Sequence, residues 1–246
     1  MIQVRDLRKR FGAVAAVNGL WFQARDGAIT GLLGANGAGK TTTLRMICGA
    51  LQPDAGSIRI DDAPANGDPI ELQSRIGALL DHTGLYSRLT ARENIRYFGE
   101  LRGLTRSRLR GQTDWVLSRL GLEAAADRRT AGFSQGERMK VALGRAIVHS
   151  PKNLLLDEPT NGLDIPTVRS LRSLLKEMRD SGMCIVFSSH VLDEVRALCD
   201  EVVVIAKGRV VAQGAPEDLC EQSGAASLED AFVNLTQPEA IECRPN

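Results

Sequence analysis

The sequence predicts an α/β fold built around a largely parallel sheet. From about residue 134 onward, short apolar runs alternate with segments of helical periodicity, which is typical of parallel strands joined by crossover helices. A glycine-rich turn at 34–39 also separates an apolar run from a helical segment, as at the first crossover of many α/β proteins. With 246 residues, 43% of them hydrophobic, the chain can bury a sizeable core.

Strands and turns are predicted for the first third of the chain. Residues 2–7 alternate apolar and polar side chains, and the apolar runs 20–24 and 29–34 are short. These features are typical of β-strands bounded by turns. The pattern then becomes helical over 40–51, and a further short strand is predicted at 56–62.

Helices are predicted for the middle of the chain, from about Thr90 to Leu120. Thr90 and Glu93 have the S/T-x-x-E spacing of a capping box, in which side chains satisfy the first free N–H groups of a helix. Residues 105–122 give a second helical segment with an amphipathic pattern. In this part of the chain we therefore predict helices without intervening strands.

Strand–helix alternation marks the second half of the chain. The predicted elements are a helix at 134–150, a strand at 152–159, a helix at 166–182, a strand at 183–190, a helix at 191–200 and a hairpin at 201–214. Pro166 suits the first turn of its helix, and Gly182 suits the end of the same helix. Lys207 and Gly208 suit the tight turn of the hairpin.

Composition narrows the class of protein. Basic and acidic residues nearly balance, 31 against 30, which argues against a protein that coats nucleic acid. The five cysteines lack CxxC or CxH spacing, so a zinc cluster is not indicated and a disulfide framework is not expected. No apolar run approaches the roughly 18 residues of a membrane-spanning helix, and the N-terminal segment does not resemble a signal peptide. Patterning weakens after about Gly224, so we expect one domain over 1–235 and a flexible tail at 236–246.

The glycine-rich loop carries the strongest functional signal. Residues 34–41, GANGAGKT, match GxxxxGK[ST] between a predicted strand and a predicted helix. Glycines permit a tight loop whose backbone N–H groups point at phosphate oxygens, and the helix N-terminus adds positive charge. Lys40 is expected to contact the β- and γ-phosphates of a bound ligand, and the Thr41 hydroxyl to bind Mg²⁺. The predicted nucleotide-binding residues are Gly34, Asn36, Gly37, Ala38, Gly39, Lys40, Thr41 and Thr42.

Two acidic residues stand where a buried strand is predicted to end. Asp157 follows three leucines and is expected to bind Mg²⁺ directly or through water. Glu158 follows at once and is expected to polarise the attacking water during hydrolysis. A solvated strand end is the alternative interpretation of this acidic pair, and the phosphate loop elsewhere in the chain disfavours it.

Three further motifs follow in a specific order: FSQGE at 133–137, NGLD at 161–164 and SSH at 188–190. With the phosphate loop and the acidic pair, this order resembles the nucleotide-binding subunit of ATP-binding-cassette (ABC) transporters over roughly residues 1–235. The resemblance implies a P-loop NTPase core with a mostly parallel sheet. It also implies an N-terminal antiparallel β-subdomain and a helical signature subdomain at about 84–148.

The resemblance assigns further site residues. It implies a head-to-tail dimer with two ATP molecules at the interface, in which Ser134 and Gly136 reach the γ-phosphate bound by the opposite subunit. Asp164 matches the acidic position of the loop that couples the two sites, and His190 matches a histidine that contacts the γ-phosphate. Phe11 matches an aromatic residue that stacks on adenine, with an ordinary buried phenylalanine as the alternative.

Two positions depart from the usual family pattern. The signature is most often LSGGQ, whereas here Gln135 replaces the first glycine and Glu137 the final glutamine. A carboxylate near phosphates is unfavourable unless it turns back to cap its own helix. Ser134 and Glu137 have the spacing of such a capping box. Glu137 is therefore not assigned as a phosphate contact. A loop that normally carries a Mg²⁺-contacting glutamine and faces the membrane partner here carries Asp81, whose metal role is the least secure of the set.

The resemblance implies an ATPase that powers a membrane exporter of the ABC-2 type. Its expected partners are an integral-membrane permease and a second nucleotide-binding subunit, either a second copy or a sister chain, and its expected place is the cytoplasmic face of the cell membrane. The alternative is a soluble ABC ATPase acting on nucleic acid or ribosomes. Such proteins usually carry a long coiled coil, a zinc module or two cassettes, and this sequence shows none of them, so no nucleic-acid partner is expected.

Overall fold

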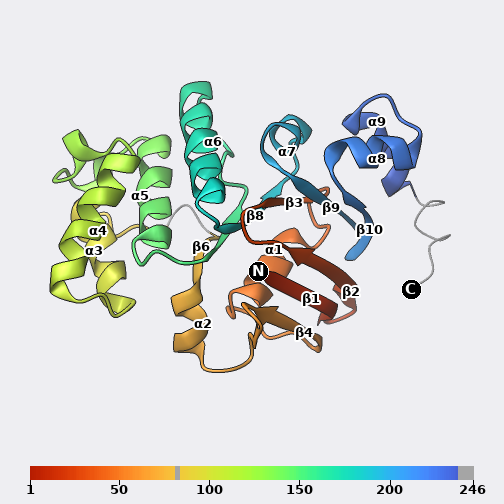
Figure 1. Ribbon diagram of the computed structural model, residues 1–246, viewed down its shortest axis with the longest axis horizontal. Coiled ribbons are helices and arrows are strands. Elements are labelled where there is room, and N and C mark those ends of the chain that lie inside the picture. The colour runs from red at the N-terminus through yellow and green to blue at the C-terminus, as the bar shows by residue number, and fades with distance from the viewer. Residues whose placement is uncertain (81–83, 238–246) are drawn as a thin grey trace.

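The computed structural model describes residues 1–80 and 84–237, which are built around two sheets (Figure 1). The larger sheet has six strands in the order β10-β9-β3-β8-β7-β6. Its strands are β3 (Ile29–Leu33), β6 (Ile76–Leu79), β7 (Asn153–Asp157), β8 (Cys184–Ser189), β9 (Glu201–Ala206) and β10 (Arg209–Gly214). Neighbouring strands run parallel except β9 and β10. The predicted α/β fold is therefore confirmed.

The smaller sheet is antiparallel and comes from the N-terminal part of the chain, as expected. Its strands, in sheet order, are β2 (Val14–Ala24), β1 (Ile2–Phe11), β4 (Ala55–Ile60) and β5 (Ala63–Pro64). Helix α1 (Lys40–Ile47) lies between the two sheets (Figure 1). Its buried side chains Leu44, Met46 and Ile47 belong to one apolar core with residues of both sheets. This core fixes the start of α1, which carries the lysine and threonine of the phosphate loop.

Helices α3, α4 and α5 pack together at the end of the molecule farthest from the C-terminal helices (Figure 1). Their bounds are Ala91–Leu101 (α3), Arg106–Arg119 (α4) and Gln135–Ile147 (α5), with short 3₁₀ turns at Glu123–Ala125 and Thr130–Gly132. Gly144 of α5 lets them approach closely, because a Cβ there would lie 2.9 Å from Ile95 and 3.0 Å from Val116. The predicted capping box of Thr90 and Glu93 begins α3.

Two further helices flank β8 in the chain. Helix α6 (Ile165–Asp180) precedes β8, and helix α7 (Leu192–Leu198) follows it. The hairpin of β9 and β10 turns at Lys207 and Gly208, as predicted, with φ values of 49° and 75°. Two successive positive φ angles are typical of the turns that suit the right-handed twist of a hairpin.

Several short elements were not predicted. They include the short strands β5 and β6 and the helices α2 (Pro69–Arg75), α8 (Pro216–Ser223) and α9 (Leu228–Thr236). The weakly patterned segment after Gly224 is helical because Leu228, Ala231 and Leu235 recur on one face and are buried. The expected tail lies outside the described residues from 238 onward. Among the described helices, none is both long and apolar enough to cross a membrane.

Candidate nucleotide site

The phosphate loop joins β3 to α1, and the Lys40 side chain folds back onto the loop. Lys40 is only 5% exposed, and its Nζ donates hydrogen bonds to the carbonyl oxygens of Gly34, at 2.7 Å, and Ala35, at 3.2 Å. Gly37 and Gly39 have φ angles of 81° and 108°, in the region that favours glycine. The loop therefore has the curvature of an anion cradle, with its single ammonium held inside.

Two other parts of the chain hold the loop in place. A Cβ at Gly39 would lie 2.5 Å from the carbonyl oxygen of Ala16 in β2, and one at Gly34 would overlap the Ile205 carbonyl in β9. The backbone N–H of Gly208 donates to the Ala38 carbonyl at 3.1 Å, and a Cβ at Gly208 would lie 2.8 Å from the same Ala16 oxygen. The loop is thus wedged between β2 and the β9–β10 turn, and both contacts require glycine.

The acidic pair ends β7, as predicted. Asp157 is 8% exposed, and the Ser188 hydroxyl of β8 donates to its Oδ1 at 2.5 Å. This contact follows from strand register, because Asp157 and Ser188 are paired across β7 and β8. Glu158 has a φ of 46°, in the left-handed region that costs free energy for a residue with a Cβ. Its N–H donates to the carbonyl and hydroxyl oxygens of Ser188, each at 3.1 Å, which holds it in this conformation.

Two predicted site residues, Lys40 and His190, converge on the carboxylate of a third, Glu158. Glu158 Oε1 lies 3.7 Å from Lys40 Nζ and 3.1 Å from His190 Nδ1. Lys40 comes from the phosphate loop, Glu158 from the end of β7, and His190 directly follows β8. A base candidate therefore stands between an ammonium and an imidazole at the carboxyl ends of adjacent strands, where ligands of α/β sheets usually bind.

The oxygen groups nearby suit a hard cation. Thr41, in the first turn of α1, supplies a hydroxyl, and Asp157 supplies a carboxylate, both of which Mg²⁺ accepts. Within the described residues there is no group of three or more acidic, histidine or cysteine side chains able to hold a metal alone. A Mg²⁺ here would need phosphate oxygens and water to complete its shell, as is common for this ion. Asp81, the other predicted ligand, lies outside the described residues.

The signature segment begins α5 with a complete capping box. Glu137 N–H donates to Ser134 Oγ at 3.2 Å, and Ser134 N–H donates to Glu137 Oε2 at 2.9 Å. Glu137 thus turns back onto its own helix, as expected, and Arg128 pairs with it at 3.4 Å. Among the described residues, no hydrogen bond or ion pair links Ser134 or Gly136 to the phosphate loop of the same chain.

Gln135, the first departure from the usual signature, contacts the NGLD segment. Its Nε2 donates to the Asn161 carbonyl oxygen at 3.0 Å, and its carboxamide occupies the space that a Cβ at Gly162 would need. Asp164 caps α6 by accepting from Thr167 N–H at 3.0 Å, and hydrogen bonds from the side chain and backbone of Thr167 lower the pKa of Asp164. No local pattern in the sequence could have predicted the contact between Gln135 and Asn161, because it joins two distant segments.

Substituting Gly162 tests this packing. Gly162→Ala is expected to lower the free energy of unfolding by about 1–2 kcal/mol, because φ is 72° and the new Cβ would overlap Gln135. Urea unfolding measures the loss. In a Gln135→Gly background the same substitution should cost less, because the overlap is gone and only the backbone strain remains. An equal cost in both backgrounds would contradict the contact.

Phe11, at the end of β1, is 52% exposed, so the alternative of an ordinary buried phenylalanine is wrong. Lys9 Nζ lies 5.9 Å from the centroid of its ring. The exposed ring leaves a π-face available for a planar ligand.

Comparison with known proteins decides the family. The ABC transporter family model matches residues 17–161, from β2 through the phosphate loop and signature to Asn161. The chain belongs to the ABC transporter family. It is therefore an ATP-binding subunit of a transporter and an ATPase.

Individual family members support this assignment. The chain is 41% identical to the ABC transporter ATP-binding protein NatA of Bacillus subtilis strain 168, over 95% of this chain and 97% of that protein. It is 37% identical to the Nod factor export ATP-binding protein I of Ralstonia nicotianae, over 89% of this chain and 68% of that protein. A solved ATP-binding subunit of an ABC transporter superposes with a TM-score of 0.89 at 30% identity, covering 96% of this chain and 100% of that chain. These are transporter subunits, not nucleic-acid-acting ATPases.

Proposed function

We propose that this ABC ATPase hydrolyses MgATP at the Lys40–Glu158–His190 cluster and powers a membrane exporter. The observation that carries the catalytic assignment is the placement of Glu158 Oε1, 3.1 Å from His190 Nδ1 and 3.7 Å from Lys40 Nζ. A carboxylate in that position lies beside the γ-phosphate that Lys40 would hold. It is therefore placed to orient a water for in-line attack.

Each residue then has a distinct role. The phosphate-loop N–H groups and Lys40 hold the β- and γ-phosphates, and the exposed Phe11 ring stacks on adenine. Glu158 accepts the proton of the attacking water, while His190 holds the carboxylate and reaches the γ-phosphate. Thr41 and Asp157 would hold Mg²⁺, which when bound neutralises charge on the phosphates. Ser188 keeps the Asp157 carboxylate in place for that ion.

The signature residues support a head-to-tail pair of subunits. Ser134 and Gly136 begin α5, and within the described residues nothing bonds them to the phosphate loop of their own chain. The N-terminus of a long helix is a ready anion site. In a head-to-tail pair, the N-terminus of α5 would face the γ-phosphate bound by the second subunit. Asp164, the N-cap of α6, would lie at the same interface. The second subunit is a further copy or a sister chain.

A separate permease would supply the membrane path, with this chain at the cytoplasmic face. Exposed apolar side chains gather along α3 and just before it: Tyr86 is 48% exposed, Tyr97 39% and Leu101 62%. The rings of Tyr86 and Tyr97 pack edge to face, with 5.4 Å between their centroids. Aromatic residues are enriched at protein interfaces, so this surface is a good candidate for the permease contact. Export, as opposed to import, is supported by the similarity to the Nod factor export ATP-binding protein I.

Purification from membranes tests the transporter assignment. The tagged chain, extracted in detergent, is expected to bring with it a protein with several apolar spans of about 20 residues each. Tyr97→Ala combined with Leu101→Ser should weaken that association, while Lys176→Ala, at an exposed position of α6, should not. Recovery of ribosomes or nucleic acid with no membrane protein would overturn the export proposal and leave the ATPase standing.

A further inference from the structure

Glu194 is a buried carboxylate in the first turn of α7, four residues after His190. It is 8% exposed. Within residues 1–80 and 84–237 its polar partners are two hydroxyl groups, and no cation forms an ion pair with it. Burying a charge without a counter-charge costs several kcal/mol unless hydrogen bonds compensate. A glutamate at this place therefore needs a reason beyond packing.

The two hydroxyls come from residues next to the proposed catalytic side chains: Thr160 lies in the turn after Glu158, and Ser189, the last residue of β8, directly precedes His190. Thr160 Oγ1 donates to Glu194 Oε2 at 2.5 Å, and Ser189 Oγ donates to the same oxygen at 3.1 Å. Thr160 is 8% exposed and Ser189 2%, so both bonds are shielded from water. One carboxylate oxygen thus joins the segment after Glu158 to the residue before His190.

Backbone contacts make each attachment stiff. The Asn161 N–H donates to the Glu158 carbonyl at 3.1 Å, so Thr160 lies inside a closed turn that begins at Glu158. The Val191 N–H donates to Ser189 Oγ at 2.9 Å, which encloses His190 in a second closed turn. The 3.1 Å contact between Glu158 and His190 spans these two turns. Its length depends on how the turns are placed relative to each other.

We propose that Glu194 is a positioning residue for ATP hydrolysis: its carboxylate holds the Glu158 turn and the His190 turn in one fixed relation. The inference rests on the proposed roles of Glu158 and His190. Glu194 has no hydrogen bond or ion pair to the phosphate loop within the described chain. Its loss should therefore lower kcat and leave ATP affinity nearly unchanged, because misplacing a reacting group by about 1 Å can cost up to about 100-fold in rate.

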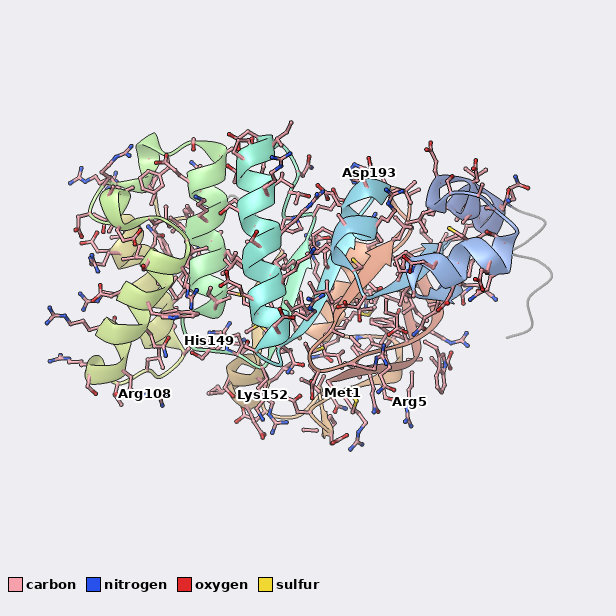
Figure 2. The ribbon with its side chains drawn as sticks, turned by 45° about the horizontal axis from the view of Figure 1, so that its top comes forward. Met1, Arg5, Arg108, His149, Lys152 and Asp193 are labelled. Carbon is pink, nitrogen blue, oxygen red and sulfur yellow. The ribbon has the colours of Figure 1, made fainter. Side chains whose placement is uncertain are left out.

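The neighbouring residue provides a matched control. Asp193 lies in the same turn of α7 and is exposed, and Figure 2 shows it at the edge of the molecule opposite to His149 and Lys152. Glu194→Ala is expected to lower kcat about 10-fold or more, with the Kd for ATP within about twofold of the wild-type value. Asp193→Ala should change neither. Glu194→Gln keeps an oxygen that can accept from both hydroxyls, so it should recover most of the rate.

The partner hydroxyl gives a second, milder test in case Glu194→Ala does not fold. Thr160→Val keeps the shape and removes the donor, so it should lower kcat without changing ATP affinity, whereas Thr160→Ser should retain the rate. Wild-type kcat in both Glu194→Ala and Thr160→Val would overturn the proposal. The proposal would also be overturned if ATP affinity and melting temperature fell in these variants in proportion to kcat, and if Glu194→Gln and Thr160→Ser recovered none of the rate.

Glu158→Gln in the same assay separates this inference from the proposed function. Hydrolysis at the wild-type rate by Glu158→Gln would remove the catalytic assignment itself. An inactive Glu158→Gln beside a fully active Glu194→Ala would remove only the positioning role.

Discussion

Glu158→Gln is expected to lower the rate of MgATP hydrolysis by at least about 100-fold while ATP still binds. General-base catalysis contributes roughly 10²- to 10⁴-fold, and an amide cannot accept the proton of the attacking water. The amide has nearly the shape of the carboxylate, and its oxygen can still accept from His190, so the site should stay assembled. Phosphate release measures the rate, and nucleotide titration measures binding.

The same variant should reveal the association of subunits. With hydrolysis blocked, ATP is expected to accumulate a dimer that elutes earlier in size-exclusion chromatography. Glu177→Gln, at an exposed position of α6, is a suitable control because the Glu177 carboxylate pairs with Arg119 and not with a residue of the proposed site. Turnover at the wild-type rate in Glu158→Gln would show that another group activates the water. A monomer at saturating ATP would count against the head-to-tail pair.

Lys40→Ala is expected to weaken ATP binding by about 10- to 150-fold. A hydrogen bond to a charged group contributes roughly 1.5–3 kcal/mol, and each 1.4 kcal/mol is about tenfold in affinity. The ammonium is already inside the loop, 2.7 Å from the Gly34 carbonyl, so little reorganisation would be needed to meet a phosphate. Equilibrium binding of a fluorescent ATP analogue measures the change. Lys176→Ala should bind normally, and unchanged affinity in Lys40→Ala would remove the phosphate-loop assignment.

The sequence predicted those parts of the site that are encoded locally. The phosphate loop, the acidic pair at the end of β7 and both capping boxes each occupy a few consecutive residues, and the structure forms them as expected. The alternation of strands and helices also predicted the parallel sheet, since each apolar run is a buried strand. Short helices such as α2 and α8 have only seven or eight residues, too few for a clear period.

Contacts between distant segments could not be predicted from local pattern. Ser188 holds Asp157 because β7 and β8 are neighbours in a particular register, and the sheet order is a property of the whole fold. Gln135 of α5 reaches Asn161, and Glu194 of α7 reaches Thr160, although the two partners of each contact are far apart in sequence. The sequence shows that Gln135 is unusual for its position, but only the structure shows what it contacts.

The β9–β10 turn has a practical consequence for labelling and engineering the protein. A two-residue hairpin turn is ordinarily an attractive point for inserting a tag or a fluorescent reporter, because chain reversals often tolerate added residues. Here Gly208 bonds to Ala38 and to Asn18, so an insertion at Lys207 would pull on the phosphate loop and on β2 together. Gly224, between α8 and α9, is a better insertion point, because it is exposed and a Cβ at that position would meet no atom within 4 Å. A reporter there would leave the nucleotide end of the molecule undisturbed.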